Sequence, residues 1–311
     1  MNNIIDLLVV GAGPAGLMAA KTAAELGLKV TLIEKNKNFE QLRRACSAQF
    51  ILDDGYANEF IKLEDGKILF TKNNFEVNYT GALVDVKNKY YKSPNGHRIH
   101  FALPGQKAFA VKFDKRKLLD DLCKECVDLG VDVRMSTLAS GVSDNGDYVS
   151  INLKDNNNNS YTLNAKKVVI AEGVNAHLTS LFGLNKGRTN FAKALVVKYI
   201  LEGVSGIEPN SWNLFYGKAF FSNAPIIIGP SLYGDNTFEL TISGSANARP
   251  DSIYENVINN SPLKKNFENA KLIDKQGCAV KAFSSLKAPY SGNVLVIGDS
   301  AAFVEVEVQG G

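Results

Sequence analysis

Apolar runs and a helix-forming segment alternate at the start of the chain. Residues Ile4–Val10 are almost entirely apolar, which is typical of a strand buried on both faces of a parallel sheet. Residues Leu17–Leu26 are rich in strong helix formers and precede Gly27, a residue type common at helix ends. Because Leu28–Ile33 return to the pattern of a buried strand, the sequence predicts a strand–helix–strand unit here.

Helical and alternating patterns follow along the chain. Residues 148–153 and 161–163 alternate on either side of a polar turn, which predicts a hairpin. Repeated alternation between about residues 189 and 288 predicts an antiparallel sheet, with one helix near 252–259 packed on it. Residues 116–130 predict a helix whose apolar stripe consists of Leu118, Leu119, Leu122, Cys126 and Leu129.

Composition places the chain among ordinary globular proteins. It has 311 residues, of which 45 % are hydrophobic and 22 % are charged, enough for two domains. The net charge of +3 is too small and too evenly spread to indicate a nucleic-acid partner. No signal peptide and no run of about 18 apolar residues is present, so no membrane span is predicted. Together with only four cysteines, these features predict a cytoplasmic protein without a disulfide framework.

A glycine-rich turn joins the first predicted strand to the first helix. It reads Gly11-Ala12-Gly13-Pro14-Ala15-Gly16, and Glu34 ends the next strand 18 residues later. This arrangement is the fingerprint of a dinucleotide site, and its alternative is a glycine turn with a purely structural role. Gly11 allows the tight turn, Gly13 lets N–H groups approach a pyrophosphate, and Gly16 lets the helix pack closely on the strand. Glu34 would accept hydrogen bonds from ribose hydroxyls.

Two later strands end in an acidic residue beside a glycine. Residues 166–175 contain Glu172-Gly173, and residues 293–302 contain Gly298-Asp299 followed by small residues that could open a helix. An aspartate at such a position can accept from a ribityl hydroxyl, and the helix N-terminus behind it offers N–H groups to phosphate or to a flavin. These two segments decide which dinucleotide is expected.

The order of the three motifs resembles the FAD-dependent oxidoreductases built like p-hydroxybenzoate hydroxylase, with the geranylgeranyl reductase branch as the nearest. Residues 42–46, 113–120 and 130–133 support the resemblance. It implies an α/β fold in which a Rossmann-like FAD-binding domain of the GR2 type carries an inserted antiparallel-sheet substrate domain. It also implies an FAD site composed of Gly11, Gly13, Pro14, Ala15, Gly16, Glu34, Lys35, Arg44, Arg116, Val133, Gly173, Gly298 and Asp299.

The resemblance predicts two interleaved domains. Residues 1–75, 106–185 and 286–311 would form the discontinuous FAD-binding domain, and residues 76–105 and 186–285 the substrate domain. No second glycine loop of this kind follows the first, so no separate nicotinamide domain is expected. The electron donor would be transiently bound NAD(P)H or another redox protein.

The chain departs from the family pattern at three places. Glu172 stands where the family carries aspartate, and the aromatic positions of the family's substrate sheet are largely replaced in residues 225–233. The chain reaches Gly310-Gly311 at the turn that normally leads into a helix under the flavin. We therefore expect a missing C-terminal segment, and one open alternative is a fragment that binds nucleotide weakly or not at all.

Cys46 is the predicted catalytic residue, because it follows two arginines and because the resemblance places it near the isoalloxazine. A buried apolar cysteine is the alternative interpretation. Arg43 and Arg44 are either ligands for an anionic substrate or cofactor phosphate, or members of a solvated turn. The pair Cys123 and Cys126 lies inside the predicted helix and favours core packing over a redox or metal site.

The remaining candidates concern the substrate. His97, His100 and His177 fall into no hydrolase or metalloprotease pattern, so no metal is expected. Five aromatic residues could line a lipid tunnel or form a sheet core: Trp212, Phe215, Tyr216, Phe220 and Phe221.

These observations predict an FAD-dependent oxidoreductase. It would reduce carbon–carbon double bonds of an apolar, isoprenoid-like small molecule, with Cys46 or water supplying the proton. A peripheral contact with a membrane fits such a substrate. A flavin monooxygenase or halogenase on the same scaffold is the second hypothesis.

Overall fold

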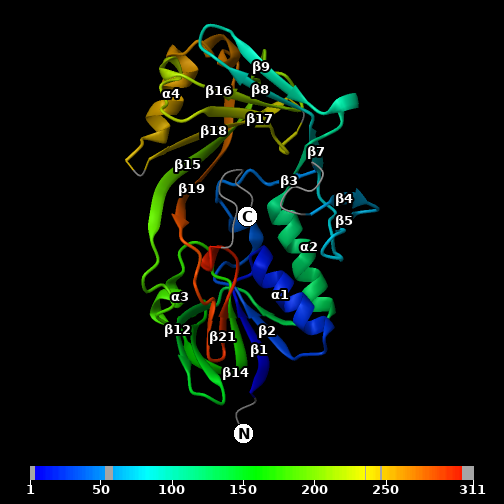
Figure 1. Cartoon of the computed structure of the whole chain (residues 1–311), viewed down its shortest axis with the longest axis vertical. Coiled ribbons are helices and arrows are strands. Elements are labelled where there is room, and N and C mark those ends of the chain that lie inside the picture. Colours follow the sequence, from blue (N-terminus) through cyan, green and yellow to red (C-terminus); the bar gives the residue numbers. More distant parts are fainter. Residues whose placement is uncertain (1–3, 53–58, 235, 246, 303–311) are drawn as a thin grey trace.

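The computed structural model describes residues 4–52, 59–234, 236–245 and 247–302. Two lobes stack along the long axis of the molecule (Figure 1). Two long strands, β15 (Asn190–Glu202) and β19 (Lys271–Phe283), run from the upper lobe towards the lower one. The expected chain end at residues 303–311 lies outside the described residues.

The lower lobe is built on a sheet that begins with the predicted strand–helix–strand unit. Its strands are β1 (Ile5–Val10), β2 (Val30–Ile33), β11 (Asp132–Arg134), β12 (Leu138–Asp144), β13 (Val149–Lys154), β14 (Ser160–Ile170), β20 (Tyr290–Ser291) and β21 (Val294–Val296). The order is β11-β2-β1-β14-β13-β12, with β21 also on β14 and β20 on β21. The pairs β11–β2, β2–β1, β1–β14 and β14–β21 are parallel, so their carboxyl ends meet at one edge.

Two helices, α1 (Pro14–Glu25) and α2 (Lys115–Asp128), pack together in one core of the lower lobe. A second core lies among β1, the hairpin strands and the short helix α3 (His177–Leu181). The side chain of Asp114 caps α2 by accepting from the N–H groups of Arg116 and Lys117. The predicted stripe of α2 is buried except for Leu129, which is 43 % exposed because the helix ends before it.

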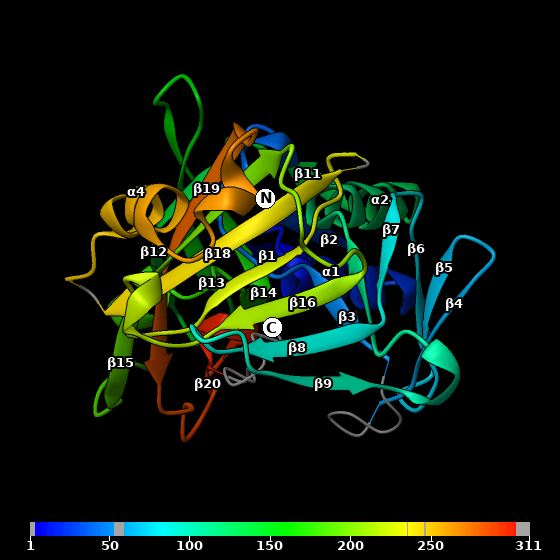
Figure 2. The same ribbon diagram turned by 90° about the horizontal axis from the view of Figure 1, so that it is seen from above.

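The upper lobe is a sheet in the order β19-β15-β18-β17-β16-β8-β9. Its further elements are β8 (Asn88–Lys92), β9 (Arg98–Ala102), β16 (Ser211–Phe215), β17 (Ile226–Pro230), β18 (Thr237–Ser245) and α4 (Pro250–Asn260). Neighbouring strands are antiparallel, apart from the parallel pair β8–β16. Helix α4 packs on the sheet, and β9 lies at its far edge (Figure 2).

Two small sheets and several 3-10 turns complete the described chain. One sheet has the order β3-β10-β7 and the other β4-β5-β6. Their strands are β3 (Gln49–Ile51), β4 (Ile61–Glu64), β5 (Lys67–Phe70), β6 (Phe75–Asn78), β7 (Leu83–Val86) and β10 (Ala110–Phe113). The 3-10 turns are Phe39–Gln41, Pro104–Gln106, Lys218–Phe220, Lys264–Phe267 and Gly298–Ser300. Residues 76–105 thus contribute strands to three sheets, and the predicted domain boundaries stay a prediction.

Asp121 ties α2 to the loop after β6, and this contact predicts a pH-dependent stability. Its carboxylate accepts from Thr80 N at 2.7 Å and from Lys117 Nζ at 2.6 Å. Burial raises the pKa of Asp121, but the hydrogen bonds from Lys117 and Thr80 outweigh burial and hold the pKa below its usual 3.8. A lowered folded-state pKa means that the stabilisation is present above about pH 4 and is lost as the pH falls.

We therefore expect Asp121→Asn to lower the free energy of unfolding by about 1–3 kcal/mol at neutral pH. The loss should shrink at about pH 3, where the wild-type carboxylate is increasingly protonated. Urea denaturation at both pH values measures it. Asp120→Asn on the same helix, where the side chain is half exposed, is the control with a smaller expected loss. An equal loss at both pH values would contradict the prediction.

Candidate functional site

The glycine turn lies at the carboxyl edge of the parallel strands and is tightly packed at two of its three glycines. A Cβ on Gly16 would lie 1.9 Å from the Gly11 carbonyl oxygen, and one on Gly11 would lie 2.5 Å from that of Ala171. Gly11 also has a φ of +102°, a conformation that favours glycine. These glycines hold β1, α1 and the end of β14 together.

Gly13 differs from its neighbours because a Cβ there would meet no atom within 4 Å. It precedes α1, whose first residues, Pro14 and Ala15, are partly or fully exposed. The open space therefore lies in front of the N-terminus of a helix of twelve residues, where N–H groups favour an anion. This arrangement fits a pyrophosphate.

Glu34 is buried beside the turn. One carboxylate oxygen accepts from Ala12 N at 2.9 Å, and the other accepts from the backbone and side-chain nitrogens of Asn36. A carboxylate has about four acceptor sites, so three hydrogen bonds leave room for a ribose hydroxyl. Val133 lies next to Leu32 of β2 and packs in the same core, whereas Lys35 is exposed.

The two later motifs meet the glycine turn at this edge. Glu172 accepts from the N–H groups of Leu178 and Thr179, so the longer carboxylate caps α3 and holds the turn. Gly173 accepts a hydrogen bond from Ser300 Oγ at 3.0 Å. A Cβ on Gly298 would lie 2.9 Å from that of Ala15, which shows how closely the last motif approaches the first. The described part of the last motif is a 3-10 turn, Gly298–Ser300.

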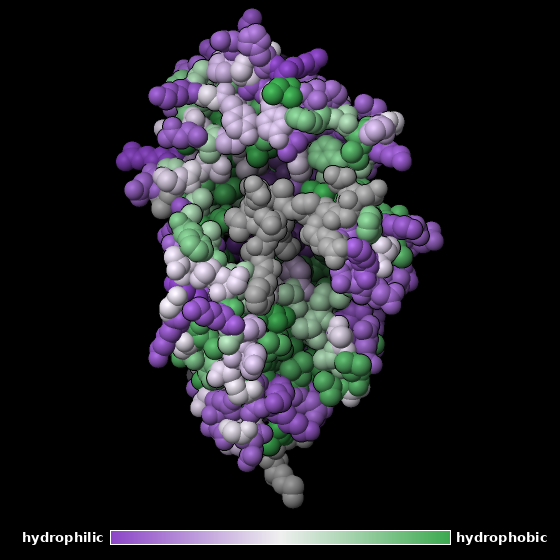
Figure 3. Space-filling view, viewed as in Figure 1, coloured by the Kyte–Doolittle hydropathy of each residue, from purple (hydrophilic) through white to green (hydrophobic). Residues whose placement is uncertain are grey.

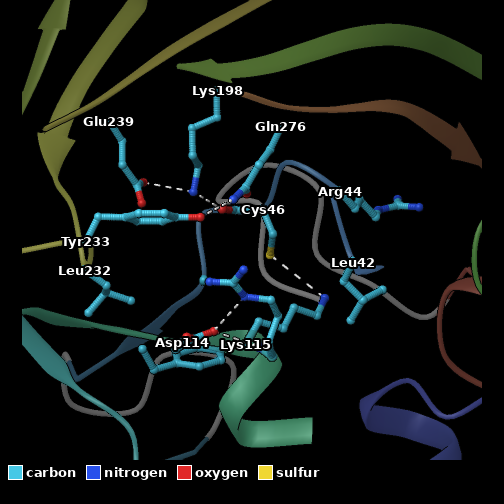
Figure 4. A pocket seen from close by; sticks show the side chains of 13 residues that line it. Leu42, Arg44, Cys46, Asp114, Lys115, Lys198, Leu232, Tyr233, Glu239 and Gln276 are labelled. Carbon is cyan, nitrogen blue, oxygen red and sulfur yellow. Dashed lines mark hydrogen bonds and ion pairs between the residues drawn. The ribbon is translucent and has the colours of Figure 1, made fainter. Parts of the chain in front are cut away.

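A cavity of about 200 Å³ lies where the upper sheet meets the N-terminus of α2 (Figure 4). Polar and charged side chains from both lobes line it, although most of the surface open to the cavity is apolar. The lining consists of Leu42, Arg44, Cys46, Ala48, Phe113, Asp114, Lys115, Arg116, Lys198, Leu232, Tyr233, Glu239 and Gln276.

The cavity brings together three predicted site residues. It also links them to the carboxyl edge of the parallel strands where the glycine turn and the two later motifs meet, called here the dinucleotide edge. Cys46, Arg44 and Arg116 line it, and Arg44 forms an ion pair of 3.8 Å with Asp299. Lys115 Nζ lies 4.0 Å from Cys46 Sγ. Arg43 does not line the cavity, because its guanidinium pairs with Asp274 at 2.9 Å.

Tyr233 forms another part of the cavity wall. Its hydroxyl donates to Asp274 Oδ2 at 2.6 Å, and the Arg116 guanidinium lies 5.9 Å from its ring centre. Burial, followed by the hydrogen bond to Asp274, raises the pKa of the Tyr233 hydroxyl above its usual value. The phenol is therefore neutral at physiological pH and presents a hydrogen-bonding group beside Arg116.

Three buried charges lie at the wall of the cavity, and two of them, Lys198 and Glu239, line it. Glu239 forms ion pairs with Lys112 and with Lys198, the latter at 2.9 Å, and all three side chains are less than 10 % exposed. Burial lowers the pKa of Lys112 to about 8. Burial alone would raise the pKa of Glu239, but Lys112 and Lys198 lower it, so Glu239 is ionised. Two lysines thus share one glutamate in this charge cluster, Lys112–Glu239–Lys198.

The sequence did not single out Lys198 or Glu239, although a signal was present for Lys198. Lys198 interrupts an apolar run inside a predicted strand, where a solvated side chain would be out of place. Glu239 occupies a polar position of an alternating strand, so its burial gives no such signal. The five aromatic candidates do not line the cavity: Phe215 and Phe220 lie in the upper core, and Trp212 packs against Phe109.

The remaining candidates take structural positions. Cys126 is fully buried, and burial raises the pKa of its thiol to about 12, which agrees with core packing. His100 stacks on Tyr90 and contacts Asn88 in the β8–β9 hairpin. Within the described ranges, no three His, Cys, Asp or Glu side chains gather in a way that could hold a metal.

The chain matches the family model described as FAD binding domain over residues 5–306. The chain belongs to this family. FAD is therefore its cofactor, and the protein is an FAD-dependent oxidoreductase, as the motif order predicts. A reviewed relative, the digeranylgeranylglycerophospholipid reductase of Methanosarcina acetivorans, is 27 % identical over 305 residues, which cover 97 % of this chain and 70 % of the relative.

Solved structures share the fold. A geranylgeranyl bacteriochlorophyll reductase-like protein from Thermoplasma acidophilum superimposes with a TM-score of 0.75 at 19 % identity, covering 98 % of this chain and 73 % of that one. The p-nitrophenol 4-monooxygenase of Pseudomonas putida gives a TM-score of 0.70 at 14 % identity, covering 98 % and 75 %. These likenesses confirm an FAD-binding α/β fold with a substrate-binding sheet.

Polar and apolar side chains are unevenly distributed over the surface. Polar side chains predominate at both ends of the molecule in the view of Figure 3, and apolar ones gather nearer its middle. Within the described part of the chain, none of the helices combines the length and the apolar character needed to cross a bilayer.

Proposed function

We propose that this oxidoreductase reduces carbon–carbon double bonds of an apolar, isoprenoid-like substrate bound in the cavity beside Cys46. The observation that carries the proposal is the position of this cavity between the upper sheet and the dinucleotide edge, linked by the Arg44–Asp299 ion pair. The names of the reviewed relatives support a lipid double bond as the substrate class.

The cofactor would be held by the sequence-predicted residues at the edge of the lower lobe. The open space at Gly13 would take the pyrophosphate, Glu34 a ribose hydroxyl and Asp299 the ribityl chain. Arg44 and Arg116 would face the flavin end from the cavity wall. FAD, when bound and reduced, supplies a hydride to an unsaturated carbon.

Cys46 would supply the proton that the second carbon of the double bond needs. Its thiol faces the cavity, and transfer of the Sγ proton leaves a thiolate that Lys115, 4.0 Å away, would stabilise. Water entering the cavity would return the proton to Sγ. Tyr233 and Arg116 in the cavity wall would orient the substrate without taking part in proton transfer.

Three further assignments belong to this proposal. The donor of electrons would be transiently bound NAD(P)H or a redox protein, since the chain carries one glycine loop of the dinucleotide type. We place the reaction in the cytoplasm, at a membrane surface that supplies the lipid; the four free thiols support a reducing compartment. Residues 76–105 and 186–285 would form the substrate domain, which supplies Lys198, Leu232, Tyr233, Glu239 and Gln276 to the cavity.

We expect Cys46→Ser to slow alkene reduction by about 10²-fold or more, because a serine hydroxyl is a far weaker acid than a thiol. FAD affinity should be unchanged. Anaerobic stopped-flow mixing of the reduced protein with polyprenyl lipids, followed at the flavin absorbance, measures the step. Cys123→Ser on α2, outside the cavity, is the control.

The same experiment separates the proposed function from its alternatives. Reoxidation by no alkene, together with rapid reoxidation by oxygen and an aromatic compound, would overturn the proposal in favour of a monooxygenase or halogenase. Absence of flavin absorption bands from the protein, once it has been saturated with FAD and separated from the excess, would indicate a chain without activity.

A further inference from the structure

Residues 42–48 carry Cys46 to the cavity without forming a helix or a strand. Three backbone carbonyls of this segment, called here the Cys46 segment, are fixed by the upper sheet. Arg43 O accepts from Gly277 N at 3.0 Å, Ala45 O accepts from Cys278 Sγ at 3.2 Å, and Cys46 O accepts from Lys198 Nζ. Lys198 therefore contacts the residue that bears the predicted proton donor.

Lys198 is itself held by the charge cluster. Its ammonium pairs with Glu239 of β18 at 2.9 Å, and Glu239 also pairs with Lys112 of β10. Strand β10 pairs with β3, which follows the Cys46 segment directly, and Lys112 is the register partner of Gln49. The contacts thus close a ring from Cys46 through β3, Lys112, Glu239 and Lys198 back to Cys46.

A gain in the stability of the fold does not explain why the chain buries the charges of this ring. Taking an ion from water into the protein interior costs several kcal/mol, and apolar replacements of buried ion pairs are often neutral or stabilising. Here two ammonium groups share one carboxylate, so the burial is not even balanced in charge. The ring lies at the wall of the cavity, where a defined geometry of Cys46 matters.

We propose that Lys198 is a positioning residue, held by Glu239 and Lys112, that fixes the Cys46 carbonyl and so keeps the Cys46 thiol directed into the cavity. The inference rests on the proposed function of Cys46 as proton donor. Lys198 acts through the backbone: its ammonium contacts Cys46 O, whereas the ammonium 4.0 Å from Sγ is that of Lys115.

The test compares Lys198→Met with the wild type. Lys198→Met removes the donor to Cys46 O but leaves Lys112 and Glu239 as a balanced pair, so the fold should persist. We expect backbone hydrogen exchange in peptides covering residues 42–48 to speed up at least about fivefold, with other peptides unchanged. We also expect kcat for alkene reduction to fall at least about tenfold, with KM and FAD affinity within about twofold.

Two further variants make the readout specific. Lys193→Met places the same change on an exposed position of β15 and should alter neither quantity. Lys198→Arg keeps a charged donor and should restore slow exchange at least in part. If Lys198→Met does not fold, the comparison uses Lys198→Arg and Lys198→Gln, which keeps a neutral donor. Intermediate exchange in Lys198→Gln and slow exchange in Lys198→Arg would then support the proposal.

The outcomes distinguish the positioning role from the function on which it rests. Exchange in residues 42–48 and kcat both within twofold of the wild type would overturn the positioning role, and so would equal exchange for Gln and Arg. Faster local exchange in a protein that reduces no alkene would support the positioning and overturn the proposed reaction.

Discussion

Gly13→Ala is expected to weaken FAD binding by about tenfold or more, about 1.4 kcal/mol, while the cofactor-free protein keeps its stability. Gly13 has a φ of −75°, which alanine adopts without strain, and the added Cβ would meet no atom within 4 Å. The methyl group therefore costs nothing in the free protein. It would occupy the space that we assign to the pyrophosphate, where the second glycine of this loop allows close approach.

Gly16→Ala is the contrasting variant, and we expect it to have the larger effect on the protein. Its Cβ would lie 1.9 Å from the Gly11 carbonyl oxygen, so the turn and the start of α1 would have to move apart. We expect this variant to lose both stability and FAD binding. Thermal unfolding without FAD and fluorescence titration with FAD measure the two quantities separately. Wild-type affinity in Gly13→Ala would show that the pyrophosphate does not lie at this loop.

Local patterns in the sequence were sufficient to predict the strand, turn, helix and acid of the dinucleotide edge. The strand before Gly11, the helix that starts at Pro14 and the acid at Glu34 follow one another within a short stretch of chain, and their chemistry is specific at each position. The carboxyl ends of parallel strands meet at one edge, which is why Gly173 and Gly298 lie beside this turn.

The cavity was harder to predict, because its contacts join distant parts of the chain. Lys112 and Glu239 are 127 residues apart, and Lys198 is 152 residues from Cys46. A strand pattern shows that a charged residue interrupts an apolar run but does not name its partner. The parallel pairing of β8 with β16 was hard to predict for a similar reason. Its register depends on the course of the long connection between the two strands rather than on either strand alone.

The largest stability effect at the cavity is expected from Glu239. Glu239 is the shared carboxylate of two buried ammonium groups, Lys112 and Lys198. Glu239→Gln keeps the shape of the side chain but leaves both cations without their anion inside the protein. Removing one member of a buried ion pair typically costs about 3–5 kcal/mol, a large share of the stability of a folded protein.

Lys112→Met makes the opposite change at the same place. It removes the excess positive charge and leaves Glu239 and Lys198 as a balanced pair, so we expect a change within about 1 kcal/mol or a gain in stability. Urea denaturation of the cofactor-free protein at neutral pH compares the two variants with the wild type. The difference in stability loss between the two variants is the decisive result. If packing alone mattered, Lys112→Met would destabilise the protein more than Glu239→Gln, because it shortens the side chain whereas glutamine keeps the shape of glutamate. A loss below about 1 kcal/mol in Glu239→Gln, or a greater loss in Lys112→Met, would show that the charges are solvated or differently paired.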